Sequence, residues 1–258
     1  MALTIDLSGS VALVTGGTRG VGAGITRALL GAGADVVTCS RRPPDRPVEA
    51  AGRTARHLRA DLRDPDAVRG LFEQVSSTYG RLDTLVNNAG GTLFRLLADS
   101  DARHAARVVE LNLLAPVTAS LAAYELMRRQ EHGGSVVMIG SVSGTRPSPG
   151  SAAYGAAKAG LANLARSMAV EWAPHVRVNT LVLGMVRTEL SHLHYGDADG
   201  IAAVARTVPL GRLAQPDEIG DACVFLASSS AAYITGASLH VHGGGERPAF
   251  LDAANADR

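Results

Sequence analysis

The stretch of sequence that decides the fold spans residues 11–22 and reads VALVTGGTRGVG. An apolar, β-branched run gives way to a glycine-rich turn, and a segment rich in alanine and leucine follows. Such a strand, turn and helix N-terminus make an anion site, because glycines let the backbone approach a phosphate while free N–H groups and the helix dipole supply positive potential. The strict G-x-G-x-x-G spacing is absent, since Ile25 stands where the last glycine would fall. Taken alone, the loop is also compatible with an ordinary tight turn.

Short apolar runs and longer helical segments alternate along the rest of the chain. The runs that predict strands are residues 11–14, 35–39, 82–86, 135–139, 176–183 and 239–241. Helices are predicted near residues 20–32, 65–79, 100–131, 151–173 and 216–228. Several of the strands are apolar on both faces, as expected for a parallel sheet covered by helices. The order predicts an α/β fold in which residues 1–258 form a single-domain, Rossmann-type, doubly wound parallel sheet of about seven strands with helices on both faces.

The overall composition excludes several classes of protein. With 46% hydrophobic and 19% charged residues the 258-residue chain can bury a full core, which excludes disorder and fibrous structure. A net charge of +1 argues against nucleic acid or an anionic membrane as a partner. We see no signal peptide and no run of roughly 18 apolar residues that would span a bilayer. Two cysteines cannot build a disulfide framework, so the sequence predicts a cytoplasmic protein.

One detail of the composition concerns the basic residues. Of the 25 lysines and arginines, 24 are arginine, and Lys158 is the single lysine. Tyr154 precedes it by four positions, so on a helix the two side chains lie on the same face. Tyrosine and lysine also pair on ordinary exposed helix faces, and the spacing alone does not distinguish the two situations.

Further motifs follow in order along the chain. They are Asp61 after the third strand, Asn87-Asn88-Ala89-Gly90 at the end of the fourth, Asn112 in a long helix, Ser141 at the end of the next strand, and Tyr154-x-x-x-Lys158. Together with Thr15-Gly16-x-x-x-Gly20-x-Gly22, these motifs resemble the classical short-chain dehydrogenase/reductase family, in particular its 3-oxoacyl-ACP reductase-like members. The resemblance covers about residues 8–245, so it extends over the whole domain.

The resemblance implies a catalytic set of Asn112, Ser141, Tyr154 and Lys158. Hydride transfer to a ketone needs a proton donor at the developing alkoxide, and a phenol with a pKa of about 10 is a poor match unless its anion is stabilised. A nearby ammonium and an oxidised nicotinamide would both lower that pKa. Ser141 would hydrogen-bond the substrate oxygen. In the family, the lysine also bonds the nicotinamide ribose and the asparagine anchors a water that relays protons to it.

The choice of cofactor depends on the end of the second predicted strand. An acidic residue there would bind the ribose 2′-OH of NAD and repel a 2′-phosphate. This chain has Ser40 instead, followed by Arg41 and Arg42, with Arg19 in the glycine loop. Arginine matches phosphate oxygens in a bidentate way and serine can donate a further hydrogen bond, so we predict NADP(H) over NAD(H). For Arg42, a solvated turn residue is an equally good interpretation.

The resemblance also assigns the remaining cofactor contacts and the substrate side. The predicted cofactor-binding residues are Gly16, Thr18, Arg19, Gly20, Val21, Gly22, Ser40, Arg41, Arg42, Asp61, Leu62, Asn88, Ala89, Gly90, Tyr154, Lys158, Gly184, Val186 and Thr188. Residues 188–212 are the expected substrate lid, with apolar contacts and with His192, His194 and Tyr195 as polar options. No metal site is expected, because the pairs His192/His194 and His240/His242 lack further ligands.

Two departures from the family pattern stand out. Leu183 replaces the usual proline before Gly184, which removes a fixed φ at the lid hinge. Residues 41–47 are too rich in proline for the crossover helix that the family commonly has there. We also expect the tail, residues 246–258, to pack at a subunit interface of a homotetramer or homodimer.

The sequence therefore predicts an NADP(H)-dependent oxidoreductase acting on a ketone or secondary alcohol of a small hydrophobic molecule, such as a 3-oxoacyl, steroid-like or polyketide-like substrate. The alternative is a dinucleotide-binding sensor or scaffold that keeps the fold without turnover.

Overall fold

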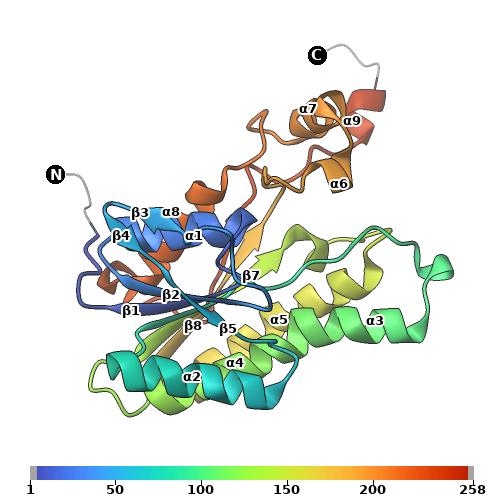
Figure 1. Ribbon diagram of the computed structural model, residues 1–258. Helices are drawn as coiled ribbons and strands as arrows, with labels where there is room; N and C mark the ends of the chain where they lie inside the picture. Colours follow the sequence, from blue (N-terminus) through green and yellow to red (C-terminus); the bar gives the residue numbers. More distant parts are fainter. Residues whose placement is uncertain (1–4, 255–258) are drawn as a thin grey trace.

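The computed structural model describes residues 5–254, which contain a seven-stranded parallel sheet of order β5-β2-β1-β6-β7-β8-β9 (Figure 1). Its strands are β1 Val11–Thr15, β2 Asp35–Ser40, β5 Arg56–Arg59, β6 Thr84–Asn87, β7 Gly134–Ser141, β8 Val176–Leu183 and β9 Ser238–Val241. The order reverses between β1 and β6, where the chain crosses from one half of the sheet to the other. The predicted doubly wound α/β fold is confirmed.

Helices cover both faces of the sheet. They are α1 Gly20–Gly31, α2 Pro65–Tyr79, α3 Ala102–Val109, α4 Ala115–Met127, α5 Ala152–Glu171, α6 His192–Tyr195, α7 Ala198–Thr207, α8 Pro216–Ala227 and α9 Phe250–Ala253. Side chains of β1 alternate between two cores: Val11 and Leu13 pack with α2, α4 and α5, while Ala12 and Val14 pack with α1 and α8. This two-sided burial explains why the strands are apolar on both faces.

The predicted helix starts are confirmed by their caps. The carboxylate of Asp64 accepts hydrogen bonds from the backbone N–H groups of Asp66 and Ala67 at the start of α2. A reciprocal capping box joins Gln215 and Glu218 at the start of α8.

The crossover from β2 to β5 lacks a helix, as the prolines predict. A two-stranded antiparallel hairpin, β3 Glu49–Ala50 with β4 Arg53–Thr54, takes its place. Val48 and Ala50 pack against the core that includes α1. The strand β5 was missing from the predicted ranges, although Asp61 was expected to follow a strand. Its sequence is Arg-His-Leu-Arg, and a strand at the edge of a sheet carries no continuous apolar run.

The long helix predicted at residues 100–131 is divided. A π-helical segment, Glu110–Leu114, separates α3 from α4 and contains Asn112. By length and composition alone the helical run Ala102–Met127 could cross a membrane, but core helices of soluble proteins satisfy the same criterion. Here Ala119, Ala123 and Met127 pack in the core beneath the sheet.

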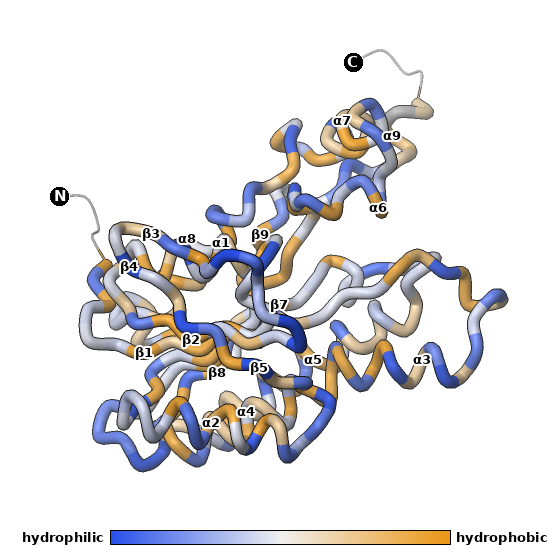
Figure 2. The backbone as a smooth tube through the Cα atoms, in the orientation of Figure 1, coloured by the Kyte–Doolittle hydropathy of each residue, from blue (hydrophilic) through white to orange (hydrophobic). Residues whose placement is uncertain are grey.

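The expected lid is largely helical and stands away from the sheet. Figures 1 and 2 show α6, α7 and α9 together beyond the carboxyl ends of the strands. The tail contacts the lid of its own chain, because the N–H of Arg247 donates to the carbonyl of Thr207 at 2.9 Å. The predicted subunit contact of the tail stays a prediction, and its last four residues lie outside the described residues.

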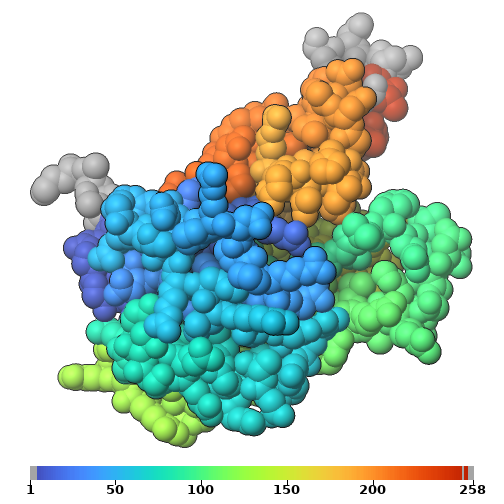
Figure 3. Space-filling model, viewed as in Figure 1, coloured from blue at the N-terminus to red at the C-terminus, as the bar shows by residue number. Residues whose placement is uncertain are grey.

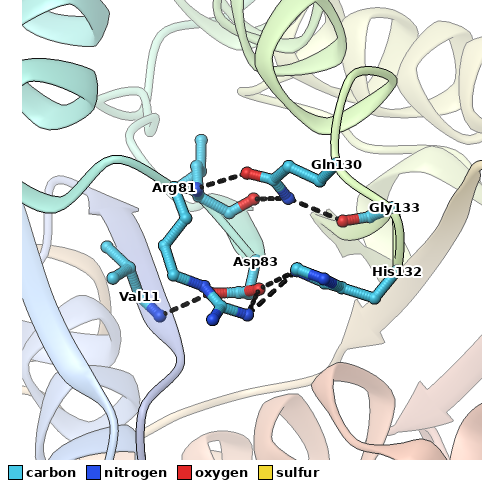
Figure 4. A network of polar contacts seen from close by, with 7 residues as sticks. Val11, Arg81, Asp83, Gln130, His132 and Gly133 are labelled. Atoms are coloured by element: carbon cyan, nitrogen blue, oxygen red, sulfur yellow. Dashed lines mark hydrogen bonds and ion pairs between the residues drawn. The ribbon is translucent and has the colours of Figure 1, made fainter.

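A polar network joins the amino ends of the central strands, opposite the lid (Figure 4). The carboxylate of Asp83 accepts from the N–H of Val11 at 2.7 Å and from the Arg81 guanidinium at 2.7 and 2.8 Å, and it lies 2.8 Å from Nε2 of His132. The Gln130 amide bridges Leu82 and the carbonyl of Gly133. Burial alone would raise the pKa of Asp83, but the bonds from Arg81, Val11 and His132 outweigh it and lower that pKa.

We expect Asp83→Asn to lower the free energy of unfolding by about 1–3 kcal/mol at pH 7, because a half-buried charged hydrogen bond is lost. Since the folded-state pKa of Asp83 lies below the unfolded value, its contribution is complete above the unfolded pKa and is lost as pH falls through the folded one. Urea unfolding at pH 7 and at pH 4 should therefore show a smaller difference between variant and wild type at the lower pH. Asp66→Asn, in an exposed pair with Arg69, is the control and should cost less than about 1 kcal/mol. Equal losses for the two variants would contradict the account.

Candidate active site

The side chains that the sequence singled out meet at one edge of the sheet. Ser40 and Ser141 end β2 and β7, the segment Asn88 to Gly90 follows β6, and Gly184 follows β8. Because the carboxyl ends of parallel strands share an edge, this edge is where α/β proteins bind ligands. Figure 3 shows the surface hollowed there, between the lid in orange and the green segment that follows β6.

The glycine loop has the shape of a phosphate cradle. Gly16 and Gly20 have φ of +62° and +52°, a conformation that favours glycine. A Cβ at Gly22 would overlap the carbonyl oxygen of Gly16. Arg19 caps α1 from an extended conformation without a side-chain hydrogen bond to the first turn, so the N–H groups of Val21 and its neighbours at the helix start have no capping side chain. The described loop therefore fits a bound phosphate.

Asn88 fixes this loop to the next strand. Its Nδ2 donates to the carbonyls of Thr15 at 2.8 Å and Gly16 at 3.2 Å. In return, the hydroxyl of Thr15 accepts from the N–H groups of Asn88 and Ala89 at 2.9 and 3.0 Å. The turn after β1 and the turn after β6 are thus locked together.

The predicted adenosine end is rich in arginine. Arg19, Arg41 and Arg42 are exposed, and within residues 5–254 the guanidinium groups of Arg19 and Arg42 make no recorded hydrogen bond or ion pair. Asp61 pairs instead with Arg63, which holds the pKa of that carboxyl at about 2, with Arg41 adding a smaller effect. The side chain of Leu62 is buried in the core, so only its backbone can face a ligand.

The segment after β8 leads into the lid. A Cβ at Gly184 would lie 2.8 Å from the Cα of His242, so a glycine is needed where β9 ends close by. Val186 bridges to Ala214 as in a parallel sheet, which fixes its backbone. The hydroxyl of Thr188 accepts from the N–H of Leu190 at 3.3 Å and the Thr188 methyl lies near Gly20, which puts it beside the glycine loop.

Lys158 is buried, with 4% of its surface exposed, at the centre of the proposed catalytic set. Its ammonium donates to the carbonyl of Ile139 at 2.7 Å and lies 5.5 Å from the ring centroid of Tyr154. Among the described residues this carbonyl is the one recorded hydrogen-bond partner, so two of the three ammonium protons are available to a ligand. Burial lowers the pKa of Lys158 to about 8.

The ionisation of Tyr154 reflects its burial and its neighbours. Burial raises the pKa of its phenol, a hydrogen bond with Ser141 opposes this, and Tyr195 raises it further. In the protein without ligand the pKa of Tyr154 is therefore raised. The lowering expected from the ammonium together with an oxidised nicotinamide stays a prediction. Ser141 is held by its own turn, where its hydroxyl accepts from the N–H of Ser143 at 3.1 Å.

Asn112 is fully buried in the π-helical segment, and its side-chain amide hydrogen-bonds both backbone groups of Gly91. Its Oδ1 accepts from the N–H of Gly91 at 2.8 Å, and its Nδ2 donates to the carbonyls of Gly91 and Val108 at 3.0 and 2.9 Å. A Cβ added to Gly90 would lie 2.5 Å from Oδ1 of Asn112 and 3.5 Å from Nζ of Lys158. Both side chains thus converge on Gly90, and one lone pair of Oδ1 stays free for a further donor.

Sequence reasoning missed several residues around this cluster. Leu93, Phe94 and Leu97 are 64–70% exposed in the segment that follows β6. Their dense apolar spacing after the N-N-A-G motif was the available signal. The segment adjoins the loop before α5, since the N–H of Arg95 donates to the carbonyl of Gly150 at 2.8 Å.

A second missed feature joins the tail to the catalytic loop. Arg146, just beyond Ser141, forms an ion pair with Glu246 of the tail. Burial raises the pKa of Tyr195, Glu246 raises it further and Arg146 opposes this, so the lid tyrosine lies within the field of that pair. Nothing in the sequence connects residues that lie 100 positions apart.

The histidine pairs show no further ligands. His192 and His194 lie on the short helix α6. The rings of His240 and His242 are 4.9 Å apart. Between residues 5 and 254, no group of three or more histidine, cysteine or acidic side chains is placed to hold a metal.

Comparisons with known proteins agree on the kind of protein. The family model described as "Enoyl-(Acyl carrier protein) reductase" matches residues 16–246. The 3-oxoacyl-[acyl-carrier-protein] reductase FabG of Escherichia coli (strain K12) is 36% identical over 243 residues, covering 93% of this chain and 98% of the relative. An uncharacterized oxidoreductase of Mycobacterium tuberculosis is 37% identical over 243 residues, covering 92% of each chain. The solved structure named "Pseudomonas aeruginosa RhlG/NADP active-site complex" has a TM-score of 0.85 and 30% identity, covering 95% of this chain and 99% of that one.

We expect Gly22→Ala to weaken the affinity for a nicotinamide dinucleotide about tenfold or more, because the new Cβ would displace the Gly16 carbonyl and distort the cradle. Gly31→Ala in the same helix is the matched control, since a Cβ there meets nothing within 4 Å. Fluorescence titration of the reduced dinucleotide measures both affinities. Unchanged binding by Gly22→Ala would contradict the proposed cradle.

Proposed function

Because the chain belongs to the classical short-chain dehydrogenase/reductase family, we propose that it is an NADP(H)-dependent oxidoreductase that interconverts a ketone and a secondary alcohol on a small hydrophobic substrate. The observation that carries the proposal is the buried ammonium of Lys158. It faces the Tyr154 ring, and two of its three N–H donors are available to a ligand. Candidate substrates are 3-oxoacyl, steroid-like and polyketide-like molecules.

Each catalytic side chain has a separate task. When bound, the dinucleotide supplies or accepts the hydride. Tyr154 donates its phenolic proton to the carbonyl oxygen as the carbonyl carbon is reduced, and takes that proton back in the oxidation. Ser141 donates a hydrogen bond to the same oxygen and orients it. Lys158 bonds the nicotinamide ribose and stabilises the tyrosinate left behind, while Asn112 holds a water that returns a proton through Lys158.

The preference for NADP(H) is supported by charge at the adenosine end. The end of β2 carries Ser40 where an acid would select NAD(H). Arg41 and Arg42 follow it, Arg19 lies in the glycine loop, and all three arginines are exposed. The solved relative named as an NADP active-site complex is consistent with this choice.

A hydrophobic substrate is supported by exposed apolar side chains on the two segments that flank the hollow in Figure 3. Leu93, Phe94 and Leu97 lie on the segment that follows β6, and Leu193, which is 53% exposed, lies on the lid. Exposed apolar side chains gathered beside a catalytic group are typical of a ligand site. The relatives named 3-oxoacyl-[acyl-carrier-protein] reductases support an acyl substrate.

The remaining parts of the proposal concern organisation. Residues 1–258 form one domain, with a substrate lid at 188–212 and a tail at 246–258. The exposed apolar side chains of Leu114 in the π-helical segment, Leu121 on α4 and Val170 on α5 favour a homotetramer or homodimer. The enzyme works in the cytoplasm, without a metal, a nucleic-acid partner or a membrane.

We expect Tyr154→Phe to bind NADPH nearly as well as the wild type and to reduce ketones about a hundredfold more slowly or worse, because the proton donor is gone. The measurement follows loss of NADPH fluorescence over a panel of hydrophobic ketones. Tyr124→Phe is the control, since Tyr124 stacks on Trp172 away from the site. If the wild type binds NADPH but turns over no ketone, the sensor alternative replaces this proposal.

We expect kcat/KM for NADPH, which reports on the free enzyme, to fall as pH rises through about 8. Burial lowers the pKa of Lys158 to about 8, so its ammonium is present below that pH and lost above it. The Tyr154 phenol stays protonated in this range because its pKa is raised. Lys158→Arg keeps its charge, and its lower activity should not decline near pH 8. The same decline in both proteins would contradict the assignment.

A further inference from the structure

The hydroxyl of Ser40 makes two hydrogen bonds at the end of β2. Its Oγ lies 2.6 Å from the carbonyl oxygen of Arg42 and 2.9 Å from Nε2 of His57. A carbonyl oxygen can only accept, so the single proton of the hydroxyl goes to Arg42. Nε2 of His57 must then carry a proton and donate it to Oγ. The three groups therefore form a chain of hydrogen bonds, in which His57 donates to Ser40 and Ser40 donates to the carbonyl of Arg42.

This chain of hydrogen bonds changes the role expected of Ser40. The sequence predicted that the hydroxyl donates to a phosphate of the cofactor, but its one proton is already used within the protein. Direct donation from Ser40 to a phosphate requires this bond to break and stays a prediction. In this structure, Ser40 holds the backbone of the residue whose side chain was expected to bind that phosphate.

The turn that follows β2 has little else to hold it. Within the described part of the chain, the bond from Ser40 to Arg42 is the one hydrogen bond recorded for the backbone of residues 41–47. Prolines at positions 43, 44 and 47 remove N–H donors, and no helix follows. Arg41 and Arg42 thus sit on a turn fixed at its start by side chains.

His57 is well placed to hold this turn. It lies on β5, in register with Thr38 of β2, and the N–H of Ala60 donates to the carbonyl of Ser40 at 3.2 Å. The two strand ends are therefore rigidly joined. The His57 ring is partly buried, and burial lowers its pKa, which favours a neutral ring near neutral pH. The neutral Nε2–H form and the protonated ring both donate from Nε2, so the hydrogen bond from His57 to Ser40 forms in either protonation state.

We propose that His57 is a positioning residue for cofactor selection: it holds the Ser40 hydroxyl on the Arg42 carbonyl and so fixes the turn that presents Arg41 and Arg42 to the 2′-phosphate of NADP(H). The inference rests on the proposed NADP(H) dependence. It adds a residue from the edge strand β5 to the 2′-phosphate contacts, which the sequence placed at the end of β2 and in the glycine loop.

The test compares two probes that differ only in the 2′-phosphate, adenosine 2′,5′-bisphosphate and adenosine 5′-monophosphate. Calorimetric titration at one fixed salt concentration measures their affinities. His57→Leu should weaken binding of the bisphosphate about fivefold to tenfold, because one ordering hydrogen bond is lost, and leave the monophosphate within about twofold. His57→Gln, whose amide can donate, should recover most of the loss. Arg56→Ala is the matched control on the same strand, because its side chain bonds Thr78, and it should change neither affinity.

Ser40→Ala removes the hydroxyl at the centre of the same hydrogen-bond chain. It is the second test variant, to be used if His57→Leu does not fold. It should cause a similar loss, and the double variant should lose no more than either single one. A wild type that does not prefer the bisphosphate would refute the NADP(H) proposal itself. A wild type that prefers it, with the preference intact in His57→Leu or in Ser40→Ala, would overturn the role of His57 alone.

Discussion

The hydrogen bond from the Lys158 ammonium to the carbonyl of Ile139 is the interaction on which the site depends. Burying an ammonium costs free energy unless its N–H groups find acceptors. Among the described residues, the carbonyl of Ile139 is the one recorded acceptor for the three N–H groups of Lys158. The bond fixes α5 against the carboxyl end of β7, and so sets Tyr154 beside Ser141. Gly90, in the turn after β6, lies against the Asn112 side chain and the Lys158 ammonium, so no larger residue would fit at position 90. The single lysine in a chain of arginines stands where a compact ammonium is required.

The proposed catalytic end and the proposed adenosine end of the site differ in how they hold charge. At the catalytic end, burial lowers the pKa of Lys158 and raises that of Tyr154, so the proton donor is intact before a ligand binds. At the adenosine end, charge stays in solvent: arginine side chains are exposed and are held by their backbone through Ser40 and His57. A buried cation suits chemistry at one atom, whereas exposed guanidinium groups suit recognition of a solvated phosphate. The sheet edge supports both, because each strand end presents one part of the site.

Much of the fold could be predicted from the sequence, because buried parallel strands and capped helices leave local signals. The range of α2 matched at both ends, and β8 matched as well. The motifs also brought the proposed catalytic residues to one edge. Three features could not be predicted, since they depend on contacts between distant residues: the polar edge strand β5, the π-helical segment around Asn112 and the ion pair of Arg146 with Glu246. The raised pKa of Tyr154 in the protein without ligand could not be predicted for the same reason, because burial is a property of the whole fold.

The central claim is that this site moves a hydride to a carbonyl carbon. The comparisons name both an enoyl reductase family model and 3-oxoacyl reductases, which differ in the bond that is reduced. The most direct measurement uses NADPH carrying deuterium at the transferred position, with an acyl substrate offered as its 3-oxo and its 2-enoyl form, followed by mass spectrometry of the products. The account predicts one deuterium on the carbinol carbon of the product from the 3-oxo substrate. Deuterium appearing only in a saturated chain from the 2-enoyl substrate would contradict it.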